Sequence, residues 1–98
     1  MGYKLFLDDE RDPPDDSWIT CRSSEEAISL AKSRGSPDFM SLDHDLGGDD
    51  TVMKFLKRFV SEVWDGDLEP PKYKVHSANP VGAKNIISFM ESWIKSLG

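Results

Sequence analysis

Short apolar runs alternate along this chain with segments that repeat apolar residues at helical spacing, and this alternation restricts the possible fold most strongly. Each run is bounded by residues that favour loops, as strands commonly are. The runs predict strands over residues 3–8, 18–21, 38–43 and 72–77. Strands that alternate with helices are typical of a parallel sheet with helices packed on its faces.

Three further segments are predicted to be helices. Ser23 or Ser24 is expected to cap the first helix, and Ser23 and Glu26 match a capping box. Gly35 fits the position just past the end of this helix. The second helix has the clearest period, over residues 52–63. The third begins at Asn79, a capping residue followed by a proline. Its expected core face consists of Ala83, Ile86, Ile87, Met90, Ile94 and Leu97.

The order of these elements and the length of 98 residues predict a single α/β domain over residues 1–98. We expect a three-layer sandwich with a parallel sheet of about four strands and with three helices. Right-handed crossovers favour the strand order 2-1-3-4. The connection between the first two strands has no helix and is short for a parallel crossover, so the second strand could instead be antiparallel or barely formed.

Acidic residues gather in two loops, which follow the first and third strands. In the expected order these strands are neighbours, and ligands of open α/β sheets bind at such a point, beside the carboxyl ends of the strands. Asp8, Asp9, Asp43 and Asp45 are therefore expected to meet there. Like charges so close together need a partner, and a divalent cation such as Mg²⁺ provides one.

A plainer interpretation is that the loop acids cap helices and remain solvated. Asp49 or Asp50 is expected to cap the second helix in this way. For Asp8, Asp9 and Asp43 the metal-site interpretation is preferred.

Two histidines, His44 and His76, follow or end strands that should be adjacent. Imidazoles can act as a general acid and base near neutral pH, so both are candidate catalytic residues beside Asp43. They could also be ligands of a softer metal such as Mn²⁺ or Zn²⁺. A lone histidine is more often structural, but two that converge on carboxylates favour a functional role.

Candidate phosphate-binding residues lie around the start of the third helix. A helix N-terminus presents free N–H groups that favour an anion, and Ser77, Asn79, Gly82 and Lys84 surround this one. Arg11 could bind a phosphate through two hydrogen bonds. Alternatively, Asn79 is a simple cap, Lys84 a solvated side chain, and Arg11 a partner of the neighbouring acids.

Composition excludes several classes of function. A net charge of −6 argues against binding to the backbone of duplex nucleic acid. The single cysteine excludes an internal disulfide and a cysteine-based zinc site. No apolar run approaches the roughly 20 residues that span a bilayer, so we expect no membrane association. These features together favour a cytoplasmic protein.

Several motifs resemble those of response-regulator receiver domains. Residues 5–10 resemble the end of their first strand, which carries an acidic metal-binding pair. Residues 41–49 resemble their phosphoacceptor strand, with Asp43 in the place of the phosphoacceptor and residue 45 in the place of a metal-binding carbonyl. Residues 77–78 resemble their Thr/Ser-Ala pair. The fifth strand, its lysine and the first helix of a receiver have no counterpart here.

The motifs of residues 8–11, 43–46 and 76–83 are more similar to a divergent branch, the cyclic-phosphate processing receiver domain family. This resemblance implies a receiver-like, flavodoxin-like fold and a metal-dependent phosphoesterase that acts on a cyclic nucleotide or a 2′,3′-cyclic phosphate end. It also implies a bacterial or phage origin.

Two alternatives remain: a receiver-like switch phosphorylated on Asp43, and a non-catalytic module that binds a small phosphorylated ligand or a host protein.

Overall fold

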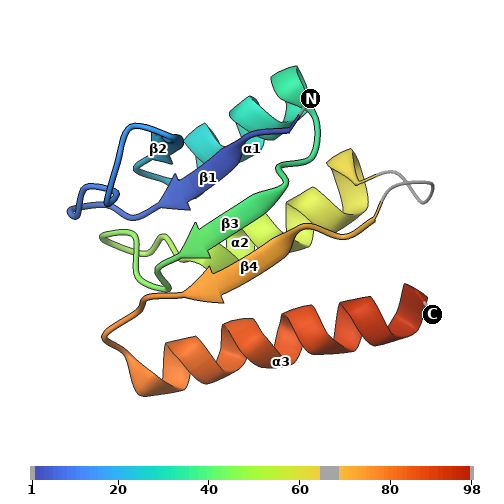
Figure 1. Cartoon of the computed structure of the whole chain (residues 1–98). Coiled ribbons are helices and arrows are strands. Elements are labelled where there is room, and N and C mark those ends of the chain that lie inside the picture. The colour runs from blue at the N-terminus through green and yellow to red at the C-terminus, as the bar shows by residue number, and fades with distance from the viewer. Residues whose placement is uncertain (1, 65–68, 98) are drawn as a thin grey trace.

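A parallel sheet of four short strands forms the centre of the computed structural model, which describes residues 2–64 and 69–97 (Figure 1). The strand order is β2-β1-β3-β4, and each neighbouring pair is parallel. This confirms the predicted order and settles the direction of β2, which pairs with β1. The strands are β1 (Lys4–Leu7), β2 (Trp18–Cys21), β3 (Phe39–Leu42) and β4 (Lys72–Val75).

The three predicted helices are present as α1 (Ser24–Arg34), α2 (Val52–Arg58) and α3 (Pro80–Leu97). A π-helical segment, η1 (Phe59–Val63), continues α2. Ser23 caps α1 through its side chain, as predicted. None of these helices is both long enough and apolar enough to cross a lipid bilayer.

The predicted cap of α2 was wrong. Thr51 occupies the N-cap position and makes no capping hydrogen bond through its side chain. The Asp50 carboxylate instead accepts hydrogen bonds from the backbone N–H and the hydroxyl of Ser24. Asp50 therefore ties the loop after β3 to the first turn of α1.

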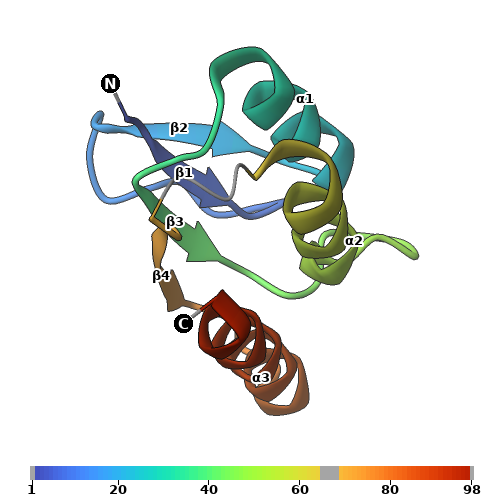
Figure 2. The same ribbon diagram turned by 90° about the vertical axis from the view of Figure 1, so that its right-hand side faces the viewer.

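The prediction of three layers was also wrong. Figure 2 shows α1, α2 and α3 on one side of the sheet, and no helix of the described residues covers the opposite face. The reason lies in the connections. Both helical crossovers, β2 to β3 and β3 to β4, advance in the same direction across the sheet, and right-handed crossovers that do so place their helices on one face. The β1–β2 connection supplies no helix for the other face.

The core lies between the sheet and the helices. Alternate strand residues such as Leu5, Leu7, Met40 and Leu42 are buried there against apolar side chains of α1, α2 and η1. The residues between them face the uncovered side.

α3 contributes fewer buried residues to the core than predicted, because this helix lies at the β4 edge of the sheet rather than over its centre (Figure 1). Its buried residues are Gly82, Ile86, Met90 and Trp93, whereas the predicted core residues Ile87, Ile94 and Leu97 are exposed.

The strand register sets the position of the acidic loops. Leu7 pairs with both Cys21 and Leu42, and Leu42 pairs with Val75. The ladder extends one residue further, because the N–H groups of Asp8, Asp43 and His76 donate to the carbonyls of Cys21, Leu7 and Leu42. Asp8, Asp43 and His76 therefore form one row across the carboxyl end of the sheet.

Candidate functional site

Three carboxylates converge where β1 and β3 end. One oxygen from each of Asp8, Asp9 and Asp43 lies within 4.8 Å of the others. Asp8 and Asp43 are buried, with exposed fractions of 1% and 8%, and Asp9 is partly buried. Because β1 and β3 are neighbours in register, residues some thirty-five positions apart meet here, as the sequence predicted from the strand order.

Asp8 is held by hydrogen bonds to both of its carboxylate oxygens. Its Oδ1 accepts from the backbone N–H groups of Glu10 and Arg11, each at 2.9 Å, and its Oδ2 lies 2.9 Å from Nε2 of His76. Burial alone raises the pKa of Asp8, but these hydrogen bonds outweigh it and hold the pKa below its usual value. Asp8 is therefore an ionised carboxylate with a fixed orientation.

The pKa of Asp43 is shifted in the opposite direction, above its usual value. Burial and the negative charge of Asp8 raise its pKa, whereas His76, Arg11 and a hydrogen bond from Ser77 lower it by less. An ionised Asp43 beside Asp8 is electrostatically costly without a compensating positive charge. A hard divalent cation with carboxylate ligands fits this donor set, whereas a soft metal would need sulfur or free imidazole ligands.

His76 is enclosed rather than free. Its Nε2 contacts Asp8, its Nδ1 lies 2.8 Å from the Ser41 hydroxyl, and its ring stacks on Phe6 at 4.7 Å between centroids. Both ring nitrogens thus have partners. A histidine hydrogen-bonded to a carboxylate in this way fixes the orientation of the carboxylate.

Sequence reasoning missed Ser41 and Phe6. The available signal was position: both residues alternate with core residues, on the face of the sheet that carries Asp8 and Asp43. A fully buried serine in an otherwise apolar strand needs a hydrogen-bond partner, and His76 provides it.

His44 follows Asp43 in the chain, and its ring lies beside the start of α3. Its Nδ1 is 2.9 Å from Oδ1 of Asp45. Gly82 faces the imidazole so closely that a Cβ there would lie 2.4 Å from Cγ of His44. The glycine therefore allows α3 to pack on this ring.

Asp45 was predicted to meet the other three carboxylates, but its side chain is not part of their group. Its side chain is exposed and contacts His44 and, at 3.2 Å, Nδ2 of Asn79. These two hydrogen bonds, that from His44 first, lower the pKa of Asp45. Its carboxylate thus orients His44 and the start of α3.

A pocket of about 430 Å³ opens beside the carboxylates, and it is predominantly polar. Of the predicted phosphate-binding residues, Arg11, Ser77 and Asn79 line it. The Arg11 side chain is half exposed, and one of its terminal nitrogens donates to the carbonyl of His76 at 2.7 Å. The full set that lines the pocket is Asp9, Glu10, Arg11, Asp43, Asp45, Gly47, Gly48, Ser77, Ala78 and Asn79.

Gly82 and Lys84 are not among the residues that line this pocket. The Asn79 Oδ1 accepts from the N–H groups of Val81 and Gly82, so these helix N–H groups are already paired. Lys84 is exposed on α3. Asn79 therefore acts as a helix cap, the simpler of its two predicted roles, while its side chain also borders the pocket.

Arg22 is a second contributor that the sequence did not reveal. It follows β2 and donates to the carbonyls of Asp8 and Arg11 and to the Asp12 carboxylate. Arg22 thereby fixes the start of the β1–β2 loop, which carries Asp9 and Arg11 into the pocket.

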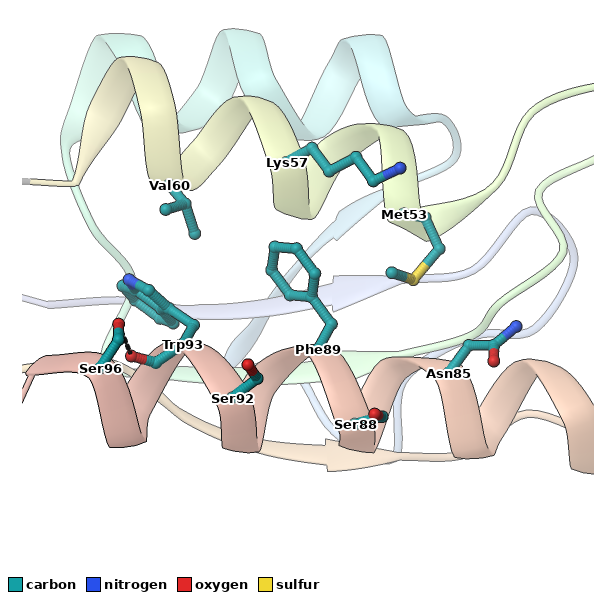
Figure 3. Close-up of a pocket in the computed structure, with 9 residues that line it drawn as sticks. All are labelled: Met53, Lys57, Val60, Asn85, Ser88, Phe89, Ser92, Trp93 and Ser96. Atoms are coloured by element: carbon teal, nitrogen blue, oxygen red, sulfur yellow. Dashed lines mark hydrogen bonds between the residues drawn. The ribbon is translucent and has the colours of Figure 1, made fainter.

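A larger groove, of about 700 Å³, lies away from this site between α2, η1 and α3 (Figure 3). Met53, Lys57 and Val60 border it on one side, and Phe89 and Trp93 on the other. No predicted site residue lines it.

Comparison with known proteins gives one match. The sequence profile of a family described as cyclic-phosphate processing receiver domain matches residues 3–92. No curated protein and no solved structure matches the sequence.

Proposed function

Because the chain belongs to the family of cyclic-phosphate processing receiver domains, we propose that it is a metal-dependent phosphoesterase that opens a cyclic phosphodiester. The observation that carries the proposal is the convergence of Asp8, Asp9 and Asp43 in a pocket that Arg11 and Ser77 also line. Anionic ligands for a cation thus lie beside donors for a phosphate.

Asp8, Asp9 and Asp43 would hold the cation, Mg²⁺ or Mn²⁺, which when bound polarises the phosphoryl oxygens. Arg11 would bind a non-bridging oxygen from the rim, since its half-exposed guanidinium borders the pocket. Ser77, whose hydroxyl donates to Asp43 in this structure, would turn that hydroxyl to a second oxygen when the substrate binds.

The reaction adds one water. The water oxygen bonds to phosphorus, one ester P–O bond breaks, and the leaving oxygen takes up a proton, so that the product is a phosphomonoester. We assign proton transfer to His44, which follows Asp43 directly and whose Nδ1 contacts Asp45, a residue that lines the pocket; the His44 ring itself packs against Gly82 and is not among the lining residues. His76 is assigned as a positioning residue, because both of its nitrogens are engaged.

The test is turnover of adenosine 2′,3′-cyclic phosphate and of 3′,5′-cyclic nucleotides with Mg²⁺ or Mn²⁺, followed by ³¹P NMR. We expect a monoester product that chelation with EDTA abolishes. Asp43→Asn should remove activity, and the matched variant Asp49→Asn, whose residue is exposed and outside the pocket, should retain it. Absence of turnover by the intact protein with every cation would refute the proposal.

A second candidate is a phosphoacceptor module, because Asp43 lines the pocket and has the position of the receiver phosphoacceptor. Incubation with acetyl phosphate should then add a phosphoryl group to the wild type and not to Asp43→Asn, as measured by intact-protein mass spectrometry. A wild-type mass that stays unchanged would exclude this candidate.

A further inference from the structure

The face of the sheet turned away from the helices carries a pattern of its own. The strand register places its residues in rows across the sheet. We call the first two rows the open face. The first row is Trp18, Lys4, Phe39 and Lys72, and the second is Thr20, Phe6, Ser41 and Lys74.

The open face ends at the site. The next row along the strands contains Asp8, Asp43 and His76, about 6.6 Å beyond the second row. The His76 ring stacks on Phe6, which in turn contacts Trp18 edge to face at 6.1 Å. Ring contacts through the buried Phe6 therefore connect Trp18 to His76, which lies beside the carboxylates.

We infer that the open face binds a short single strand of RNA and leads its 2′,3′-cyclic phosphate end to the carboxylate site. The inference rests on the proposed function and specifies its substrate class. A 2′,3′-cyclic phosphate requires the 2′-hydroxyl of RNA. Exposed aromatic side chains on a four-stranded sheet are a known means of stacking two or three RNA bases.

The aromatic residues suit this role. Trp18 and Phe39 are partly exposed and meet edge to face, with centroids 5.7 Å apart. Bases stack on such rings without regard to sequence.

The lysines supply the charge. Lys72 and Lys74 are exposed on β4, and the ammonium groups of Lys4 and Lys74 lie 4.6 and 5.6 Å from the centre of the Trp18 ring. None of these three lysines forms an ion pair with a residue in 2–64 or 69–97. In a chain with a net charge of −6, three cations on one face mark a local site for a polyanion.

Acidic groups border the open face at two places and limit where a polyanion can lie. Asp12 and Asp15 lie on the β2 side, and the exposed Asp38 and Glu69 line a pocket with Lys4, Phe39 and Lys72 at the amino ends of β3 and β4. Asp12 binds Arg22 at the end of β2. The Asp15 carboxylate accepts hydrogen bonds from the backbone N–H and the hydroxyl of Ser17, and these hydrogen bonds, with a smaller contribution from the charge of Lys4, lower its pKa. The strand is therefore directed over the second row, toward Lys74 and the carboxyl ends of β3 and β4, away from both acidic groups.

Binding is tested with a fluorescein-labelled hexanucleotide RNA that ends in a 2′,3′-cyclic phosphate, by anisotropy without divalent cations. We expect Lys72→Glu/Lys74→Glu to weaken binding at least tenfold and to flatten the salt dependence. The matched variant Lys54→Glu/Lys57→Glu, which alters exposed lysines of α2, should stay within twofold. Phe39→Leu should weaken binding at least fivefold. Equal affinities for both lysine variants, no detectable binding, or equal affinity for a duplex would overturn the inference.

Turnover separates this inference from the proposed function. With Mn²⁺, Lys72→Glu/Lys74→Glu should lower kcat/KM for the hexanucleotide at least tenfold and leave adenosine 2′,3′-cyclic phosphate unaffected. If both substrates are hydrolysed equally well by all variants, the open face is not a substrate site and the phosphoesterase stands. If neither is hydrolysed but the hexanucleotide binds in a lysine-dependent way, the phosphoesterase fails and the RNA site stands.

Discussion

At the scale of single residues, the site is defined by two aspartates in unlike environments. Hydrogen bonds stabilise the ionised form of Asp8, whereas burial and the charge of Asp8 destabilise that of Asp43. The protein itself therefore stabilises the negative charge of Asp8, whereas the negative charge of Asp43 needs an added positive charge.

This difference predicts that Asp43→Asn stabilises the protein in EDTA. The amide removes a buried like charge and keeps the shape of the side chain, so the thermal midpoint should rise by several degrees, on the order of 1 kcal/mol. The same variant should lose Mn²⁺ binding by isothermal titration calorimetry. Asp49→Asn, an exposed control, should change neither quantity. A lower midpoint for Asp43→Asn in EDTA would contradict this electrostatic account.

A second residue-scale prediction concerns His76. His76→Phe preserves an aromatic ring over Phe6 but removes the hydrogen bonds to Asp8 and Ser41. Loss of such a partner typically weakens metal binding about 10–100-fold, and we expect that range for Mn²⁺ by calorimetry. His44→Phe should abolish turnover while metal affinity is retained. Equal metal affinities in wild type and His76→Phe would show that His76 does not position Asp8.

At the scale of elements, the start of α3 is fixed by its contact with the loop after β3. Gly82 meets the His44 ring, and Asn79 joins the helix cap to Asp45. This contact connects the helix to the residues that follow the phosphoacceptor-like position.

Gly82→Ala should therefore destabilise the protein, because its Cβ would overlap His44. The expected loss is about 1–3 kcal/mol in urea denaturation. In a His44→Ala background the same change should cost little, since the obstructing ring is absent. Ser88→Ala, at an exposed position of the same helix, is the control. An equal cost in both backgrounds would show that the ring is not the obstacle.

Much of the element structure could be predicted from the sequence. The apolar runs located all four strands, and the crossover rule gave their order, which is enough to bring Asp8 and Asp43 together. The number of layers could not be predicted in the same way. Apolar periodicity shows that one face of a helix is buried, but it does not show on which side of the sheet that helix packs. The burial predicted for Ile87 and Ile94 was wrong for a related reason, because the sequence does not show that α3 lies at the β4 edge of the sheet.

The finer arrangement of the site also lay beyond the sequence. That His76 contacts Ser41 and Asp8 depends on the pairing of β4 with β3, a contact between segments far apart in the chain. The direction of the Asp45 side chain depends on where α3 begins. Such contacts are determined by tertiary packing, and no local pattern encodes them.

At the scale of the whole molecule, stability should fall in alkaline solution. Burial raises the pKa of Cys21 from 9.0 to about 11 and that of Tyr3 from 10.0 to about 12. Between pH 9 and 12 the folded state keeps protons that the unfolded state has lost, so stability decreases as the pH rises. Urea midpoints at pH 8, 9.5 and 11 measure this decrease. Cys21→Ala should reduce the decrease between pH 9 and 11, and an unchanged decrease would contradict the assignment.

The pairing of β1 with β3 also limits where the sequence can accept insertions and deletions. A residue inserted or deleted within β1 would turn Asp8 toward the opposite side of the sheet, and the carboxylates would separate although none had been mutated. The stretch between Arg11 and Trp18 lies outside the ladder, so changes in its length would leave both acids in place. Tolerance to insertions and deletions should therefore differ sharply between these two adjoining segments, and a library of single-codon insertions would map the boundary.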